Sequence, residues 1–98
     1  MNPAKVERKN VAQFTDLPNV GAATAADLRV LGFHSPADLI GQDPYSMYNR
    51  LCEITRVRHD PCVIDVFLSI THFMDGGRAK SWWSYTDQRK AFLKKRQR

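Results

Sequence analysis

The 98-residue chain lacks the features that mark membrane, secreted and disulfide-rich proteins. No apolar run approaches the ~18 residues that a membrane-spanning helix needs. No apolar stretch follows the basic residues near the N-terminus, so we expect no signal peptide. Two cysteines are too few for a disulfide scaffold. These absences predict a small protein of the reducing cytoplasm.

Motifs of enzyme and metal chemistry are also missing. The sequence contains no nucleophile–base pair, no phosphate-binding loop with a lysine and no paired carboxylates at helical spacing. Cys62 and His72 would lie ten residues apart on one helix, about 15 Å along its axis, which is too far for one ion. Together with Cys52 and His59 they match no zinc spacing. We therefore expect no enzyme activity, no metal and no other cofactor.

Positive charge is in excess, and it is concentrated at the C-terminus. The 15 basic and 10 acidic side chains give a net charge of +5. Residues 88–98 carry six of the basic side chains and no acidic one, so the rest of the chain would have a net charge of −1. The chain therefore divides into a near-neutral body, residues 1–87, and a basic C-terminal tail, residues 88–98. Such a tail either neutralises phosphates or is a solvated, frayed end.

Apolar residues recur at helical spacing, and no strand-like alternation extends beyond four residues. Prolines, glycines and capping side chains separate the helical stretches. The pattern predicts an all-α fold of about five helices followed by a basic C-terminal helix. The expected helices cover about residues 2–14, 22–31, 36–40, 44–54 and 61–74, with a last one that starts at Thr86-Asp87 and fades into the basic end.

The same spacing predicts which side chains face the core. The expected inner faces consist of Val11 and Phe14; Ala25, Leu28 and Leu31; Met47, Tyr48, Leu51 and Ile54; and Val63, Val66, Phe67, Ile70, Phe73 and Met74. Asp60 is expected to cap the helix that follows it, and Asp65 to face solvent. Trp82 and Trp83 are expected in a loop that closes the open end of the bundle, with one of them buried and the other exposed; the alternative is that they stack on bases or on a partner.

Several segments resemble known sequence patterns. Residues 17–33, which begin Leu-Pro-Asn-Val-Gly, resemble the helix-hairpin-helix motif of DNA-repair and replication proteins and the C-terminal domain of TfoX-type competence regulators. The longer pattern adds residues 41–44, 58–67 and 82–86. Over residues 12–92 the chain is similar to the small bacterial pathogenicity-locus proteins, also labelled mitomycin-resistance-like. The resemblance implies a tandem helix-hairpin-helix (SAM-like) domain in residues 1–87 and nucleic acid as the class of ligand.

Two breaks between predicted helices are the candidate binding elements, namely the first hairpin (residues 18–21) and the second hairpin (residues 57–60). A turn that leads into a helix N-terminus presents unpaired amides and the positive end of the helix dipole, which together hold a phosphate. Such contacts read only the backbone, so binding would not depend on sequence. The candidate nucleic-acid-binding residues are Asn19, Val20, Gly21, Thr24, Arg56, Arg58, Lys90, Lys94, Lys95 and Arg96, with Arg98 as a further tail cation.

The sequence also departs from the helix-hairpin-helix pattern. Asn19 stands where the motif has its first glycine, and Asn tolerates the left-handed conformation better than most residues. Ala23 stands where DNA-binding hairpins often have lysine, and Asp60 lies where a phosphate would approach the second hairpin. These departures favour a different function, a protein–protein interaction adaptor that keeps the helical scaffold. The partner is therefore nucleic acid, most simply duplex DNA, or an unidentified protein.

Cys52 and Cys62 allow a third, minor interpretation as a thiol sensor. They lie on either side of the second hairpin, where antiparallel helices would bring them within disulfide reach. Cys62, near a helix N-terminus and beside His59, is expected to have a lowered thiol pKa. The alternative is that both are small residues that pack the helix pair.

Overall fold

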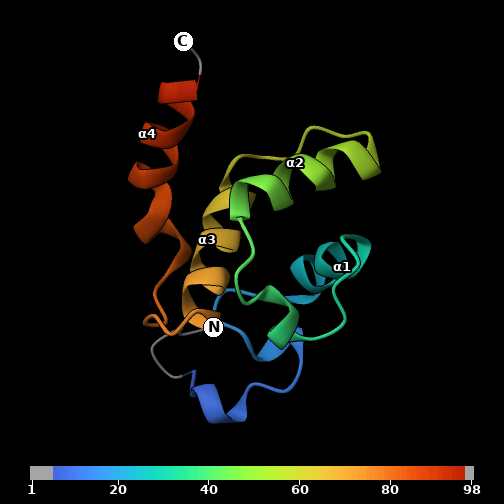
Figure 1. Cartoon of the computed structure of the whole chain (residues 1–98), viewed down its shortest axis with the longest axis vertical. Coiled ribbons are helices and arrows are strands. Elements are labelled where there is room, and N and C mark those ends of the chain that lie inside the picture. The colour runs from blue at the N-terminus through green and yellow to red at the C-terminus, as the bar shows by residue number, and fades with distance from the viewer. Residues whose placement is uncertain (1–5, 97–98) are drawn as a thin grey trace.

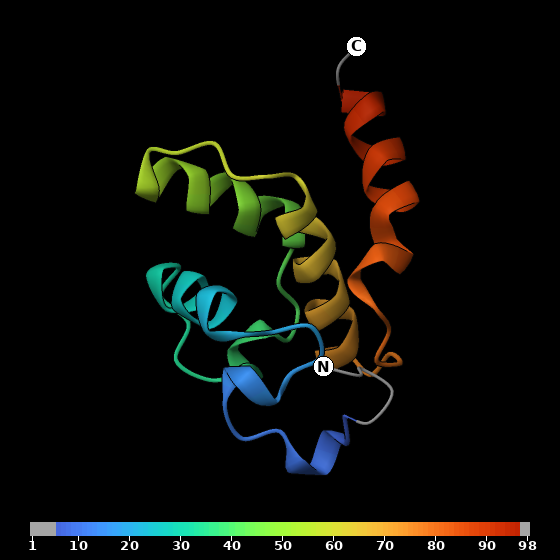
Figure 2. The same cartoon turned by 180° about the vertical axis from the view of Figure 1, so that it is seen from behind.

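The computed structural model describes residues 6–96, which form an all-α fold as the sequence predicts. Four α-helices cover Ala22–Val30 (α1), Pro44–Thr55 (α2), Cys62–Met74 (α3) and Thr86–Arg96 (α4). Short 3-10 turns lie at Arg8–Asn10 (η2), Phe14–Asp16 (η3), Pro36–Leu39 (η4) and Trp82–Tyr85 (η5). Helix α3 stands in the middle, with α1 and α2 to one side and α4 to the other (Figures 1 and 2). In this part of the chain no helix has the length and apolar character needed to cross a membrane.

Aspartates occupy most of the helix starts, as the capping pattern predicts. Asp43 and Asp60 each accept a hydrogen bond from the amide two residues later, at 3.0 and 2.8 Å. Asp38 accepts hydrogen bonds from the amides of His34 and Ser35, at 2.7 and 3.1 Å, and so holds the start of η4. Each of these bonds satisfies a donor that the helix itself leaves unpaired.

The helix predicted over residues 2–14 is wrong in the described part of the chain. Only the turns η2 and η3 form there, and Val11 between them is extended, with φ −84° and ψ 103°. The Asp16 carboxylate accepts hydrogen bonds from the amides of Ala12 and Gln13, each at 3.0 Å. These local bonds draw the amides away from a helical ladder. The first four residues of the predicted helix lie outside the described part.

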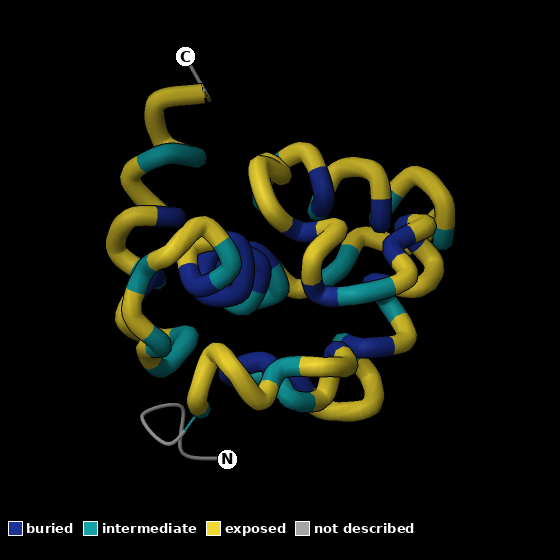
Figure 3. The backbone as a smooth tube through the Cα atoms, turned by 60° about the horizontal axis from the view of Figure 1, so that its bottom comes forward, coloured by how far each residue is buried: buried dark blue, intermediate teal, exposed yellow. Residues whose placement is uncertain are grey.

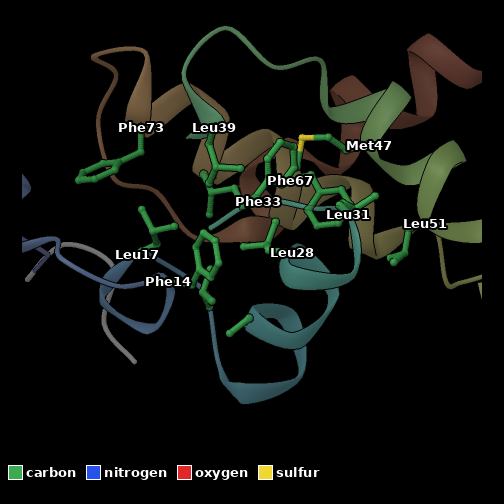
Figure 4. Close-up of a cluster of buried hydrophobic side chains, with 13 residues drawn as sticks. Phe14, Leu17, Leu28, Leu31, Phe33, Leu39, Met47, Leu51, Phe67 and Phe73 are labelled. Carbon is green, nitrogen blue, oxygen red and sulfur yellow. The ribbon is translucent and has the colours of Figure 1, made fainter. Parts of the chain in front are cut away.

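The main core lies between α1, α2 and one face of α3 (Figure 4). Most of the predicted inward residues are buried in it, with Leu17, Val20, Phe33 and Leu39 added from the connecting segments. The α2 face is predicted with one error, because Ile54 is 51% exposed. It lies in the last turn of α2. On α3 only Phe67, Ile70 and Phe73 are fully buried among the predicted positions.

Helix α3 is buried around nearly its whole circumference, which Figure 3 shows as a central stretch of buried residues. Its other face packs against η5 and α4 through Ile64, Leu68 and Tyr85. The expectation that Asp65 faces solvent is wrong, because its exposed fraction is 0%. Arg89 of α4 donates to its carboxylate from Nε at 2.9 Å and from Nη2 at 3.3 Å. Thr86 Oγ1 adds a third hydrogen bond at 2.8 Å.

The basic C-terminal segment is helical as far as the structure describes it. Helix α4 runs to Arg96, so the boundary expected between residues 87 and 88 falls inside it. Besides the ion pair of Arg89, the ring of Phe92 stacks on Tyr45 of α2, with centroids 3.6 Å apart. The segment is therefore held at fixed points against α3 and α2, and its lysines stand on an ordered helix.

Candidate nucleic-acid interface

Asn19 shapes the first hairpin and fastens it to the rest of the protein. Its backbone is left-handed, with φ 66°, as expected for an Asn in the place of glycine. Its side-chain Nδ2 donates to Ser69 Oγ of α3 at 3.1 Å and to the backbone carbonyl of Lys80 at 2.7 Å. Gly21, by contrast, has extended backbone with φ −101°, so the tight bend belongs to Asn19. Val20, the third residue of the hairpin, is buried and anchors it in the core.

The amides at the start of α1 are unoccupied. Gly21 is its N-cap and has no side chain to cap with, and the first turn contains no acidic residue. Within residues 6–96, the amides of Gly21, Ala22, Ala23 and Thr24 have no protein acceptor. The first three of these residues are exposed and Thr24 is half-buried. No atom lies within 4 Å of the position a Gly21 Cβ would take, so the approach to these amides is open.

The second hairpin is arranged differently, because it carries its own anion. The exposed Asp60 carboxylate accepts the hydrogen bond from the Cys62 amide, which lowers the pKa of Asp60. The carbonyl of His59 accepts a hydrogen bond from the Tyr48 hydroxyl, and Thr55 Oγ1 lies 2.8 Å from His59 Nε2. A carboxylate therefore already occupies the positive end of α3. A phosphate there would meet a like charge.

The predicted cations do not gather around the first hairpin. Lys90, Lys94 and Lys95 are exposed on α4, which lies on the far side of α3 from α1 (Figures 1 and 2). Arg58 and Arg96 instead line the same hollow between α2, α3 and α4. Arg56 has left-handed backbone, with φ 56°, at the end of α2. Arg98 lies outside the described residues.

Sequence reasoning missed a basic segment whose backbone contacts the first hairpin. The segment between α3 and η5 contains Arg78 and Lys80, both exposed, and the Lys80 carbonyl is the acceptor for Asn19. The Lys80 ammonium lies 5.9 Å from the centroid of the Tyr85 ring. Two basic residues in three positions after a Gly-Gly pair were the available signal. Their relation to residue 19, 61 positions away, was not visible in the sequence.

The two tryptophans differ in exposure, although neither is fully buried as one of them was expected to be. Trp82 is half-buried, whereas Trp83 is 63% exposed, and their rings meet edge to face with centroids 5.7 Å apart. Both belong to η5, which packs against α3 and precedes α4. The exposed ring is one of the few large apolar groups on the surface of the described chain.

The cysteines have separate surroundings. Both are free and half-buried. The expectation of a lowered pKa at Cys62 is wrong, since its hydrogen bond to the Asp60 carboxylate and its burial raise the thiol pKa. The helix N-terminus does not activate this thiol because Asp60 neutralises that end of the helix. Arg89 Nη2 lies 3.9 Å from Cys62 Sγ, and its positive charge lowers the thiol pKa, but by less than the other groups raise it. Among residues 6–96 no group of three or more His, Cys, Asp or Glu side chains is placed to hold a metal ion.

Comparison with known proteins identifies the family. The family model described as "Cdd1: Pathogenicity locus" matches residues 7–91. The chain is 34% identical over 82 residues to a protein of Streptomyces lavendulae named "Mitomycin resistance protein McrB", an alignment that covers 84% of this chain and 78% of that protein. No solved structure matches the chain significantly. The similarity to the mitomycin resistance protein agrees with the resemblance seen in the sequence. That resemblance is therefore confirmed, and the chain belongs to the pathogenicity-locus (Cdd1) family.

Proposed function

We propose that this protein binds duplex DNA without sequence preference, through phosphates held by the backbone amides at the start of α1. The observation that carries the proposal is the open helix start, where four amides have no acceptor within the described chain and no acid lies in the first turn. Amides and the helix dipole together make such a site attractive to phosphate without a charged side chain.

The neighbouring segment supplies the long-range attraction that Ala23 does not. Asn19 ties the hairpin to the Lys80 carbonyl, so Lys80 and Arg78 are on the chain next to the hairpin. Both are exposed, and neither forms an ion pair within residues 6–96. We propose that a duplex that lies along the α1 start also passes this basic segment, whose two exposed cationic side chains attract its phosphates. Contacts of this kind position the backbone and carry no base information.

The proposal is tested by fluorescence anisotropy with two labelled 20-base-pair duplexes of unrelated sequence. At ~50 mM salt we expect the same affinity for both, decreasing steeply as salt is raised. Gly21→Asp places a carboxylate on the free amides and should weaken binding about tenfold or more. The matched control, Gly21→Ala, leaves the amides free and should bind within about twofold of wild type. Open space around Gly21 and its extended backbone allow both substitutions.

Two results would overturn the proposal. One is the absence of any binding by the wild-type chain at ~50 mM salt, where phosphate contacts are strongest. The other is equal binding by Gly21→Asp and Gly21→Ala, which would place the contact elsewhere. Lys80→Ala is expected to lower affinity severalfold and to reduce the salt slope by about one, as for one lost phosphate contact.

A protein–protein adaptor is the second candidate, and the position of α4 favours it. The lysines of α4 stand on the side of α3 that faces away from α1, so they do not extend the first hairpin into one continuous basic face (Figures 1 and 2). The two functions differ in the residues they use. A duplex would contact the start of α1, whereas a protein partner has a different surface available on α2 and α4.

A further inference from the structure

A groove runs between α2, the start of α3 and the C-terminal half of α4. It contains two adjoining hollows of about 200 and 340 Å³, which share Tyr48, Asn49, Ile64, Leu93 and Arg96 in their walls. Among the described residues, none of the first hairpin or of α1 lines either hollow. The groove is therefore separate from the proposed DNA site at the start of α1.

The floor of the groove is apolar. Ile64 is 1% exposed, and Tyr48, Cys52 and Leu93 are half-buried around it. The stack of Phe92 on Tyr45 forms the wall at the α2 start. Covering apolar surface of this kind with an apolar side chain is favourable in free energy.

Among the described residues that line the larger hollow, two arginines are the only charged ones. Arg58 comes from the second hairpin and Arg96 from the last turn of α4, and both are exposed. Within residues 6–96 neither guanidinium has a carboxylate oxygen within 4 Å. Arg96 is placed over the Phe92 ring, 5.4 Å from its centroid, which holds it beside the groove.

The acids nearest the groove are already engaged. Asp60 accepts from the Cys62 amide, and Asp65 is paired with Arg89. Within residues 6–96, therefore, no carboxylate forms an ion pair with either arginine. Arg is the side chain best suited to bind a partner's carboxylate, because its planar donor fork matches both oxygens.

We propose that this groove docks an acidic segment of another protein. An aromatic or leucine side chain of the segment inserts between α2 and α4 onto Ile64 and Leu93, and carboxylates beside it pair with Arg58 and Arg96. The volume of the larger hollow, about 340 Å³, is at the small end for a pocket that encloses a whole organic ligand but suits one or two anchor side chains. The opposite charges would set the orientation of the segment and speed its association.

The test uses the full chain and a phage-displayed library of 12-residue peptides. After panning, the enriched sequences should combine Trp, Phe or Leu with at least two Asp or Glu residues. A fluorescein-labelled synthetic copy of the commonest one is then measured by anisotropy. Arg58→Glu should weaken its binding about tenfold or more, while Arg78→Glu, the same charge change outside the groove, should leave it within about twofold.

A neutral pair of variants separates the groove from general electrostatics. Asn49→Trp fills the groove from an exposed position on α2 and should abolish peptide binding, whereas Gln42→Trp, equally exposed but outside the groove, should not. Circular dichroism confirms that each variant is folded. Enrichment of peptides without acidic residues, or equal peptide binding by Asn49→Trp and wild type, would overturn the proposal.

The same variants distinguish this proposal from DNA binding at α1. Gly21→Asp should leave peptide binding unchanged, and Asn49→Trp should leave duplex binding unchanged. If the duplex competes with the peptide and both are lost in Asn49→Trp, the groove binds nucleic acid and the protein-docking proposal is wrong. Failure of either proposal therefore leaves the other measurable.

Discussion

Each of the two hairpins leads into an α-helix, but the amides at the two helix starts differ in whether a side chain caps them. At the first hairpin, Gly21 leaves the amides at the start of α1 without a cap. The side chain of the left-handed Asn19 donates hydrogen bonds to α3 and to the Lys80 carbonyl instead. At the second hairpin, Asp60 places its own carboxylate on the start of α3. Arg56, the left-handed residue there, forms no hydrogen bond that fixes it within residues 6–96.

The difference shows that a helix start can serve stability or ligand binding, but not both at once. A carboxylate cap satisfies an amide and the helix dipole, which stabilises the helix and excludes external anions. An uncapped start leaves the donors to water, which a ligand can displace. The first hairpin compensates through tertiary contacts of Asn19, which hold the turn without covering its amides.

Among the hairpin substitutions, the largest stability effect is expected at Asn19. Asn19→Ala removes the two side-chain hydrogen bonds and puts alanine, which disfavours the left-handed conformation, at φ 66°. The free energy of unfolding should therefore fall by about 3 kcal/mol. Asn19→Gly removes only the hydrogen bonds and should cost about 2 kcal/mol. Urea denaturation measures both. Equal destabilisation would mean that backbone strain contributes nothing at this turn.

Arg56→Gly should stabilise the protein, in contrast to the substitutions at Asn19. Glycine adopts the left-handed conformation without steric cost, and Arg56 contributes no fixed contact to lose. We expect a gain of about 0.5–1 kcal/mol in the free energy of unfolding. A loss of stability in urea denaturation would show that the Arg56 side chain holds the second hairpin in the way that Asn19 holds the first.

Acid should affect the second hairpin selectively. Because the pKa of Asp60 in the folded chain lies below its ordinary value of 3.8, its contribution to stability is complete above that value and is lost as pH falls through the folded pKa. The urea midpoint of wild type should therefore drop below about pH 4. The Asp60→Asn variant should be less stable than wild type at pH 6, and its urea midpoint should fall less than that of wild type as the pH is lowered.

Asp16 and Asp38 have pKa values lowered by amide hydrogen bonds in the same direction, so part of the acid loss should remain in Asp60→Asn. A pH profile of Asp60→Asn parallel to that of wild type would mean that the carboxylate of Asp60 gives α3 no stability. The first hairpin contains no carboxylate, and Gly21→Ala should retain the wild-type profile.

The smallest effect is expected on α4. Lys94→Glu and Lys95→Glu reverse charges on the side of α3 away from α1, so duplex affinity should fall less than about threefold for each. Lys80→Glu, the same change beside the first hairpin, should lower it at least tenfold. Truncation before α4 is not an equivalent test, because it removes Arg89 and leaves Asp65 buried without its partner, a loss of about 3–5 kcal/mol. Similar losses for Lys94→Glu and Lys80→Glu would place the duplex on α4.

Local patterns predicted most of the helices because their causes are local. The stripes of α1 and α3 and the caps Asp38, Asp43 and Asp60 lie within a few residues of the elements they form. The N-terminal helix failed because Asp16 bonds back to two amides, a competitor of the same short range that periodicity does not register. Ile54 fits the helical stripe of α2 but is exposed in the last turn of that helix.

The candidate sites were predicted in part. The open amides after residue 20 follow from Gly21 and the run of alanines, which provide no cap. The neighbours of those amides did not follow, because Lys80 reaches the first hairpin through a contact across 61 residues. The groove was missed altogether, since Arg58 and Arg96 come together only when α2 and α4 pack on the same end of α3.

By itself the sequence determined the all-α class, the ends of α1, α2 and α3 and the division between a capped and an uncapped helix start. These properties depend on side-chain spacing and on hydrogen bonds within a single turn. Tertiary structure decided which charges are available: it buried Asp65 against Arg89, moved the basic helix away from the first hairpin and brought two arginines to one groove. The reason is that burial and charge pairing depend on which faces meet, and the packing of helices around α3 sets those faces only after the local structure has formed.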